Sequence, residues 1–431
     1  MPRKKIKVFQ APKGMRDILP QEQVYWERFL TKAEELAQAY GFQKIETPIL
    51  EETELFVRST GATTDIVSKQ MFALKTAGDD NLALRPENTP GVLRAYLENG
   101  MINLPQPVKL YYFGQMFRYE QPQAGRYRQF YQFGIEVVGE RDAVIDVQII
   151  QFCATLFGEL GLPKINFQIN SLGCPHCRPG FRRALLDYYR YRKNRICPDC
   201  RRRMKENPLR LLDCKEEKCQ PIKANSPAIV DYLCDECRAH FKQVLEYLDE
   251  LEIPYFLDNT LVRGLDYYTR TVFEVFIEKM GDDGAVDSLA LGGGGRYDNL
   301  AKSLNVKKEI PGVGVSFGVD RIVELATYAK LVPRLVKKPK VFFIQLSFDA
   351  KLHCFEVIEA LRQAKIPVQH SLSKDSLSAQ LGLAEKIGVP FTIILGQKEA
   401  LDGTVIVRNM DSRSQDTIKV VKLAEYLKKI K

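Results

Sequence analysis

Apolar residues recur at helical spacing near the N-terminus and then give way to shorter runs that are typical of strands. From about Gln21 to Tyr40 they fall three or four positions apart, which predicts an amphipathic helix. Two aromatic-rich runs follow between Val108 and Gly139, on either side of the polar stretch Gln121–Arg126. This pattern predicts an antiparallel hairpin with a long loop.

Later segments extend the same type of structure. A second strand pair is predicted at Thr271–Glu278 and Ser288–Leu291, ahead of the glycine run Gly292–Gly295, and a strand-to-helix turn is predicted at Gly312–Glu324. Antiparallel strands with helices packed on them define the α+β class.

The pattern changes near the C-terminus. Prolines and a charge run at residues 331–338 predict a linker. Beyond it, strands alternate with helices, which predicts a small, mostly parallel α/β domain. The expected strands are Val341–Leu346, Pro367–His370 and Phe391–Leu395, and the expected helices are Ala350–Ala364 and Leu377–Ile387.

The length of 431 residues exceeds what one hydrophobic core usually supports. A cysteine-rich block interrupts the α+β pattern and is interpreted as an insertion. The expected division is a core domain at 1–172 and 259–330, the insertion at 173–258, the linker at 331–338 and the C-terminal domain at 339–431.

Eight of the ten cysteines form close pairs. The basic stretch Met1–Lys7 precedes no apolar run, and no stretch reaches the length of a membrane span, so we expect a cytoplasmic protein that does not enter a membrane. In that compartment close cysteine pairs indicate metal ligands, and three CxxC pairs with one CxxxxC pair fit two tetrahedral structural zinc sites. The alternative is that the thiols bind no metal. The pairs are Cys174 and Cys177, Cys197 and Cys200, Cys214 and Cys219, and Cys234 and Cys237.

Sequence spacing leaves open which pairs share an ion, and His176 and His240 are further candidate ligands. The same region is strongly basic. Between Ser171 and Arg210 there are twelve Lys and Arg against three Asp and Glu, a surplus equal to the net charge of +9 for the whole chain. This distribution predicts a surface that contacts a phosphate backbone, and the alternative is a solvated helical face.

The predicted hairpin carries the densest set of charged side chains. Arg118 ends its first strand, Arg126 lies in its loop, and Glu136 lies on its second strand. Arginines that converge from a strand end and a loop are suited to bidentate binding of a polyphosphate, and Phe130 could stack on a purine. The alternative is that these arginines are ordinary surface residues.

Four other segments add candidate chemistry. Leu84–Pro90 is a proline turn whose polar side chains could meet an ammonium group, although it could equally be a helix N-cap. Leu261–Arg270 is a polar and aromatic cluster, and Gly292–Asp298 is a glycine run that matches neither a P-loop nor a dinucleotide fingerprint. Gly312–Arg321 places an arginine at the start of a helix.

Together these segments resemble the histidyl-tRNA synthetases, which are class II aminoacyl-tRNA synthetases. The resemblance spans nearly the whole chain from Ala11–Asp17 onward and is most specific in Arg126–Phe130 and Leu261–Tyr268. It implies a class II antiparallel sheet with helices, a C-terminal anticodon-binding domain and a homodimer. It also implies ligation of L-histidine to the 3′ end of histidine tRNA through a histidyl-adenylate, with ATP and Mg²⁺.

The resemblance also implies residue roles. Arg118 would bind the α-phosphate of ATP and, with Arg263, would stabilise charge in the chemical step. The implied ATP-binding residues are Arg118, Glu120, Arg126, Phe130 and Arg321. The implied histidine-binding residues are Glu87, Asn88, Thr89, Gln132, Glu136, Arg263, Tyr267, Tyr268 and Tyr297. Gln123 is the implied tRNA contact.

Three positions depart from the family pattern, which usually has Gly at Asn88, Arg at Gln121 and His at Tyr131. These departures bear on tRNA handling more than on adenylate formation. The rival interpretation is a catalytically silent paralogue that acts as a histidine-binding regulator or an RNA-binding protein. The C-terminal domain and the segment around Arg263 argue against a regulator.

Overall fold

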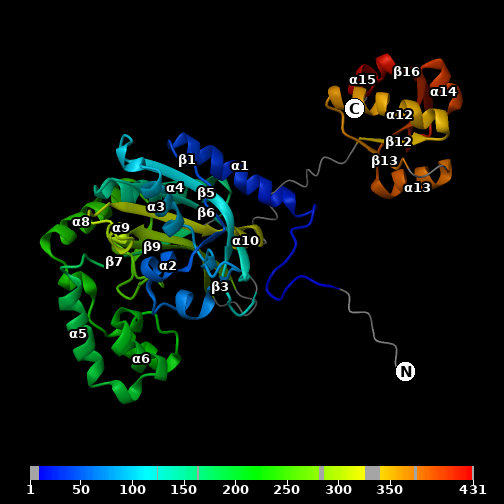
Figure 1. Cartoon of the computed structure of the whole chain (residues 1–431). Coiled ribbons are helices and arrows are strands. Elements are labelled where there is room, and N and C mark those ends of the chain that lie inside the picture. The colour runs from blue at the N-terminus through cyan, green and yellow to red at the C-terminus, as the bar shows by residue number, and fades with distance from the viewer. Residues whose placement is uncertain are drawn as a thin grey trace, which may run out of the picture. The chain divides into compact units, whose positions relative to one another are not determined.

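The structure is a computed structural model that describes residues 9–123, 125–162, 165–280, 286–325, 340–372 and 376–429. The chain forms two compact units, Met1–Pro333 and Arg334–Lys431 (Figure 1). The predicted linker at 331–338 lies outside the described residues. None of the helices in the described ranges combines the length and apolar character that crossing a lipid bilayer requires.

An eight-stranded sheet forms the centre of the first unit, in the order β1-β5-β6-β11-β10-β9-β7-β8. The two edge pairs, β1 with β5 and β7 with β8, are parallel, and the remaining pairs are antiparallel. The strands are β1 (Gln43–Lys44), β5 (Val108–Phe117), β6 (Gln129–Val138), β7 (Ile165–Ser171), β8 (Tyr255–Leu257), β9 (Thr269–Met280), β10 (Val286–Arg296) and β11 (Gly312–Gly318). The predicted α+β class with an antiparallel sheet is confirmed.

Helices cover one face of this sheet because that face is almost entirely apolar. On β6, Phe133, Ile135 and Val137 alternate toward it, as the two-residue period of a strand requires, and all three are fully buried. Trp26 and Phe29 of α1 pack into the same core. The covering helices are α1 (Gln23–Ala39), which the apolar spacing predicted, α4 (Ala143–Glu159), α8 (Asp235–Glu250) and α10 (Val319–Val323).

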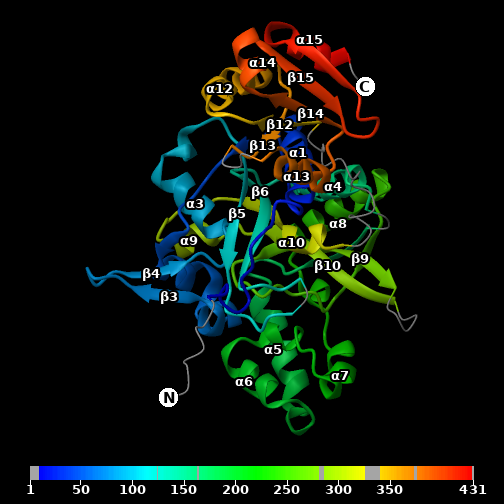
Figure 2. The same ribbon diagram turned by 90° about the vertical axis from the view of Figure 1, so that its right-hand side faces the viewer.

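Smaller elements lie over the opposite face of the sheet (Figure 2), whose polar side chains include Gln132 and Glu136. A three-stranded sheet in the order β2-β4-β3 and three α-helices lie in this part of the unit. These elements are β2 (Leu50–Glu52), α2 (Thr53–Phe56), β3 (Phe72–Lys75), β4 (Asn81–Leu84), α3 (Thr89–Glu98) and α9 (Leu300–Ser303).

The strand pair β9 and β10 is longer than the sequence predicted. The glycine run Gly292–Gly295 lies inside β10, whereas the prediction placed it after the strand. The reason is close packing: a Cβ on Gly293 would lie 2.3 Å from the Arg263 guanidinium, and a Cβ on Gly294 would lie 2.1 Å from a β11 carbonyl oxygen. Glycine therefore allows the strand to continue beneath other groups.

The cysteine-rich segment forms a helical subdomain between β7 and β8, at the bottom of Figures 1 and 2. Its helices α5 and α6 enclose a small hydrophobic core of their own, which includes Phe181, Leu185 and Leu211. The last helix of the segment, α8, instead packs on α4 of the main core. The elements before α8 are α5 (Arg178–Arg190), α6 (Pro198–Glu206), a 3₁₀ turn at Pro208–Leu211 and α7 (Gln220–Ala224).

The second unit is a five-stranded sheet with helices, in the order β13-β12-β14-β15-β16. The three strands that the sequence predicted, β13, β12 and β14, are parallel, whereas β15 and β16, which it did not predict, pair antiparallel with their neighbours. A short helix at Gln397–Asp402 joins β14 to β15, and a turn joins β15 to β16. The prediction of a mostly parallel sheet therefore holds for the first three strands only. The elements are β12 (Val341–Gln345), α12 (Phe348–Gln363), β13 (Val368–His370), α13 (Leu377–Ile387), β14 (Phe391–Leu395), α14 (Gln397–Asp402), β15 (Thr404–Asn409), β16 (Gln415–Lys419) and α15 (Val420–Lys429).

Candidate active site

The residues that the sequence singled out gather at one cavity on the sheet face opposite α1. They come from the turn before α3, from β5 and β6 with their connecting loop, from the segment before β9, from the end of β10, and from α10. The predicted site residues that line the cavity are Glu87, Thr89, Arg118, Glu120, Arg126, Phe130, Gln132, Glu136, Arg263, Tyr267, Tyr268, Tyr297 and Arg321.

One end of the cavity is built around a buried carboxylate on β6. Because strand side chains alternate, Gln132 and Glu136 face the cavity while their neighbours face the core. Glu136 is 1% exposed and accepts hydrogen bonds from the hydroxyls of Thr89 and Tyr297, each at 2.6 Å. Burial raises its pKa to about 7, although both hydrogen bonds favour the charged form. Glu136 can therefore exchange a proton near neutral pH.

A second carboxylate, Glu87, lies at the same end. It is 5% exposed and accepts hydrogen bonds from Tyr267 at 2.5 Å and from Thr60 at 2.7 Å. Burial raises the pKa of Glu87. Among the described residues, the Oε1 atom of Gln132 is buried with no hydrogen-bond partner. A buried acceptor beside two carboxylates suits a ligand that brings a cationic donor, such as an ammonium group.

The other end of the cavity is cationic. Arg321 donates to the carbonyl oxygens of Gly125 at 3.0 Å and Ala290 at 2.8 Å, which fixes its position beside the hairpin loop. Burial and the neighbouring cation Arg126 lower its pKa. Arg118 donates to the Pro86 carbonyl at 2.9 Å and lies over the Phe130 ring. Fixed arginines that disfavour one another's charge are suited to a polyanion such as a phosphate chain.

Arg263 lies between these two ends. It forms an ion pair with Glu274 on β9, and its guanidinium is 5.8 Å from the centre of the Tyr268 ring. Burial is the largest single influence and disfavours its charged form, but Glu274, Tyr268 and Tyr267 together outweigh burial, and the pKa is raised. Arg263 is therefore a permanent, positioned cation where the anionic and cationic ligand groups would meet.

The other singled-out side chains lie elsewhere. Asn88 is buried beside the cavity, where it accepts a hydrogen bond from Thr47 at 2.6 Å. Gln123 is exposed on the hairpin loop and forms a β-bridge with Arg126. Tyr131 packs against Trp26 and Phe113 on the helix-covered face, so its departure from the family pattern lies away from the cavity.

Among the lining residues, the sequence analysis missed Glu274 and Tyr112, which face the cavity from strands. It also missed Thr60, which lies behind the lining and donates a hydrogen bond to Glu87 from a segment with no motif. A polar residue within an apolar strand is the available signal for Glu274. For Thr60 the sequence offers none, because the contact joins residues 27 positions apart through tertiary structure.

Away from the cavity, the eight paired cysteines form two groups that could each hold a metal ion. One contains Cys174, Cys177, Cys234 and Cys237, and the other contains Cys197, Cys200, Cys214 and Cys219. Within each group all four sulfur atoms lie within 4.8 Å of one another. The first and last pairs therefore belong together, which spacing left open. His240 instead hydrogen-bonds Asp146 and Thr271.

An antiparallel sheet that carries a cavity with an arginine-lined end and a carboxylate–tyrosine end matches the arrangement of a class II aminoacyl-tRNA synthetase. A sequence model described as histidyl-tRNA synthetase matches residues 14–187 and 209–322, and one described as anticodon binding domain matches residues 340–430. The chain belongs to the histidyl-tRNA synthetase family.

Individual relatives agree with this assignment. The chain is 43% identical to the histidine–tRNA ligase of Dehalococcoides mccartyi, covering 98% of this chain and 100% of that one, and 41% identical to that of Desulforamulus reducens, covering 97% and 98%. The crystal structure of apo S. aureus histidyl-tRNA synthetase matches with a TM-score of 0.79 and 31% identity, covering 98% of this chain and 100% of that one. A Bacillus halodurans protein titled as an ATP phosphoribosyltransferase regulatory subunit/histidyl-tRNA synthetase shares the fold at 22% identity, covering 91% and 99%, with a TM-score of 0.61.

The raised pKa of Glu136 generates a prediction. Below about pH 7 its carboxyl group should be protonated, and above that value it should be ionised, because burial shifts its pKa upward. Infrared difference spectroscopy across pH 5–9 should show one buried carboxyl band lost with a midpoint near 7, and Glu136→Gln should remove that band. A midpoint below 5 would contradict the burial argument.

Proposed function

We propose that this protein is a cytoplasmic enzyme that ligates L-histidine to the 3′ end of histidine tRNA through a histidyl-adenylate. The observation that carries the proposal is the single cavity that joins a buried carboxylate–tyrosine pocket to a group of fixed arginines. Sequence identities of 43% and 41% to histidine–tRNA ligases, each over nearly the full length of the chain, support the same activity. A catalytically silent paralogue would not need a cation at the position of Arg263, so this residue argues against that alternative.

The pocket end fits histidine. The Glu136 carboxylate would accept a hydrogen bond from one imidazole nitrogen, and the Tyr268 hydroxyl would donate to the other. Glu87, Thr89 and Gln132 would bind the α-ammonium group, for which the unpartnered Gln132 oxygen is already placed. Tyr267 and Tyr297 hold the two carboxylates in position. A site built from buried polar groups rejects apolar amino acids because those groups would lose their partners.

Asn88 has a different place in this proposal. Its side chain supports the turn through Thr47, so it shapes the histidine pocket without touching the ligand.

The arginine end fits ATP. Arg118 would bind the α-phosphate, Arg126 and Arg321 the outer phosphates, and Phe130 would stack on adenine, with Glu120 at the same end. The histidine carboxylate then attacks the α-phosphorus in line and pyrophosphate leaves. Arg263 and Arg118 stabilise the negative charge that develops on the phosphoryl oxygens, and Mg²⁺ bound with ATP shares that task.

The tRNA surface follows from the distribution of charge. Arg182, Arg183 and Arg190 are exposed on α5, whereas Arg210 is buried and paired with Asp65. We infer that the exposed basic residues of α5 and α6 contact the acceptor arm, that Gln123 approaches its end, and that residues 339–431 bind the anticodon. By the family resemblance two copies form a homodimer, which sedimentation analysis would test.

We also propose that each cysteine group binds Zn²⁺. A zinc–sulfur distance of about 2.3 Å in a tetrahedron places sulfur atoms about 3.8 Å apart. The sulfur atoms are separated by 3.6 Å for Cys174 with Cys177, 3.9 Å for Cys174 with Cys234, and 3.8 Å for Cys197 with Cys214. These values fit a shared ion and are far longer than a disulfide bond of about 2.05 Å.

The activity is tested by ATP–pyrophosphate exchange with each standard amino acid. Exchange should require histidine, and Arg263→Ala should reduce its rate about 10²–10³-fold, because a positioned charge on the transition state is lost. Arg141→Ala is the matched control, since Arg141 forms an exposed ion pair with Glu309. Histidine binding without exchange in the unaltered protein would favour the regulatory paralogue.

The tRNA surface is tested by replacing Arg182 and Arg183 together with glutamine. The KM for tRNA in aminoacylation should rise about tenfold with a shallower dependence on salt, because phosphate contacts release counterions. Exchange without tRNA should continue, and Lys32→Gln on α1 is the control for the loss of a positive side chain elsewhere on the surface. An unchanged KM and salt slope would place the tRNA elsewhere.

Metal content provides the test for zinc. Elemental analysis of protein purified without added metal should find two zinc ions per chain. Replacement with Co²⁺ should give the absorption of tetrahedral thiolate coordination. Fewer than one ion per chain, with all thiols titratable, would contradict the assignment.

A further inference from the structure

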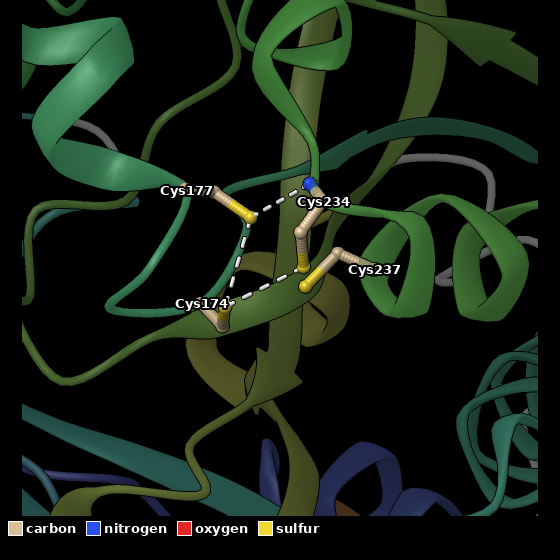
Figure 3. A group of neighbouring side chains, drawn as sticks. All are labelled: Cys174, Cys177, Cys234 and Cys237. Carbon is tan, nitrogen blue, oxygen red and sulfur yellow. Dashed lines mark hydrogen bonds between the residues drawn. The ribbon is translucent and has the colours of Figure 1, made fainter.

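The two cysteine groups lie in different hydrophobic cores. Cys174 and Cys177 directly follow β7, and Cys234 and Cys237 lie at the start of α8, so the first group joins the two ends of the cysteine-rich segment (Figure 3). Its buried members pack in the same core as the central sheet. The second group lies in the separate small core of the segment.

Residues 258–268, here called the histidine-pocket segment, connect β8 to β9 without forming a helix or strand. They nevertheless carry Arg263, Tyr267 and Tyr268 into the cavity. A loop that must present three side chains at a fixed geometry requires support from the structure around it.

The middle of this loop contacts the small core through Val262 and through the hydrogen bond that Asn207 donates to Asp266 at 2.8 Å. The end of the loop, where it enters β9, is supported by the backbone beside Cys174. The Leu172 N–H donates to the Arg270 carbonyl at 2.7 Å, and the Arg270 N–H donates to the Gly173 carbonyl at 2.9 Å. Arg178, which follows Cys177, donates through its guanidinium to the carbonyls of Leu172 and Tyr268. The chain on both sides of the cysteine pair is thus bonded to the end of the histidine-pocket segment.

Arg270 ties this end to the other cysteine pair. Its guanidinium pairs with Glu236, which lies between Cys234 and Cys237, and also with Asp298 at 3.7 Å. Its backbone has φ +50°, in the left-handed region that is unfavourable for a non-glycine residue. The contacts from both cysteine pairs hold this unfavourable conformation, which directs the chain from Tyr268 into β9.

We propose that the metal ion bound by Cys174, Cys177, Cys234 and Cys237 is a positioning site for the amino-acid pocket: it fixes the backbone that presents Tyr267 and Tyr268 to histidine. This inference rests on the proposed function, since it assigns a consequence to one of the two ions. Loss of this ion weakens histidine binding, whereas loss of the ion in the small core leaves the first group and its contacts in place.

The matched variants are Cys237→Ser in the first group and Cys200→Ser in the second. Each should contain one zinc ion per chain instead of two. In pyrophosphate exchange, Cys237→Ser should raise the KM for histidine about tenfold, within the usual range of coupling between sites, with the KM for ATP changed less than about twofold. Cys200→Ser should change the KM for histidine by less than about threefold.

Two further variants separate positioning from general damage. Cys234→His, at the half-exposed ligand, should retain both ions and a near-normal KM for histidine, because Cys₃His is an ordinary zinc shell. Cys354→Ser removes a thiol in the second compact unit and serves as the control for cysteine replacement. Circular dichroism and thermal unfolding report whether each variant is folded.

Reciprocity gives a test that does not require the Cys237 variant to fold. If the ion favours histidine binding, histidine must favour ion binding by the same factor. At equilibrium with a competing chelator, saturating histidine should therefore reduce zinc release from Cys200→Ser, which keeps only the first ion. In the unaltered protein it should reduce the release of one of the two ions.

The outcomes distinguish the proposals. One lost ion with an unchanged KM for histidine in folded Cys237→Ser, or zinc release that is indifferent to histidine, would overturn the positioning role. Absence of zinc from the unaltered protein would overturn the metal assignment itself. Absence of histidine-dependent exchange in the zinc-loaded, unaltered protein would instead overturn the proposed function.

Discussion

The burial of Glu136 in the middle of the central sheet is the constraint on which the rest of the site depends. A carboxylate that is 1% exposed survives only with hydrogen-bond donors around it, and Thr89 and Tyr297 supply them from α3 and the end of β10. The neighbouring strand must also leave room, since a Cβ on Gly314 would lie 1.7 Å from the carboxylate oxygen. Three elements far apart in the sequence are thus shaped by one charge.

The burial of charged groups also determines how the cavity as a whole is arranged, with carboxylates at one end and arginines at the other. Under the proposed function, carboxylates gather where the amino acid would bring an ammonium and an imidazole, and arginines gather where the nucleotide would bring phosphates. Burial raises the pKa of Glu87, and burial with Arg126 lowers the pKa of Arg321, so each end would favour a ligand group of opposite charge. Arg263, paired with Glu274, would lie where the two substrates react.

How much of this the sequence could predict depends on the range of the interactions. The hairpin β5–β6 and the helix α1 follow from local periodicity, and the motif resemblance located most of the lining residues. The pairing of cysteines and the partnership of Thr60 with Glu87 depend on tertiary contacts that no local pattern encodes. The continuation of β10 through Gly292–Gly295 was missed because glycine usually signals a turn, whereas here its lack of a side chain permits close packing.

The two cysteine groups have the same four ligands but lie in different hydrophobic cores, so a bound ion would have a different effect on the structure at each. A small helical segment has little apolar surface to bury, so an ion bound within its own core would supplement its hydrophobic contacts. The first group has a large core around it already, shared with Phe273 and Val275 of the sheet. An ion there would add little to burial. Under the proposal it would add rigidity at the junction where Arg270 turns the chain, and that junction follows directly after Tyr267 and Tyr268.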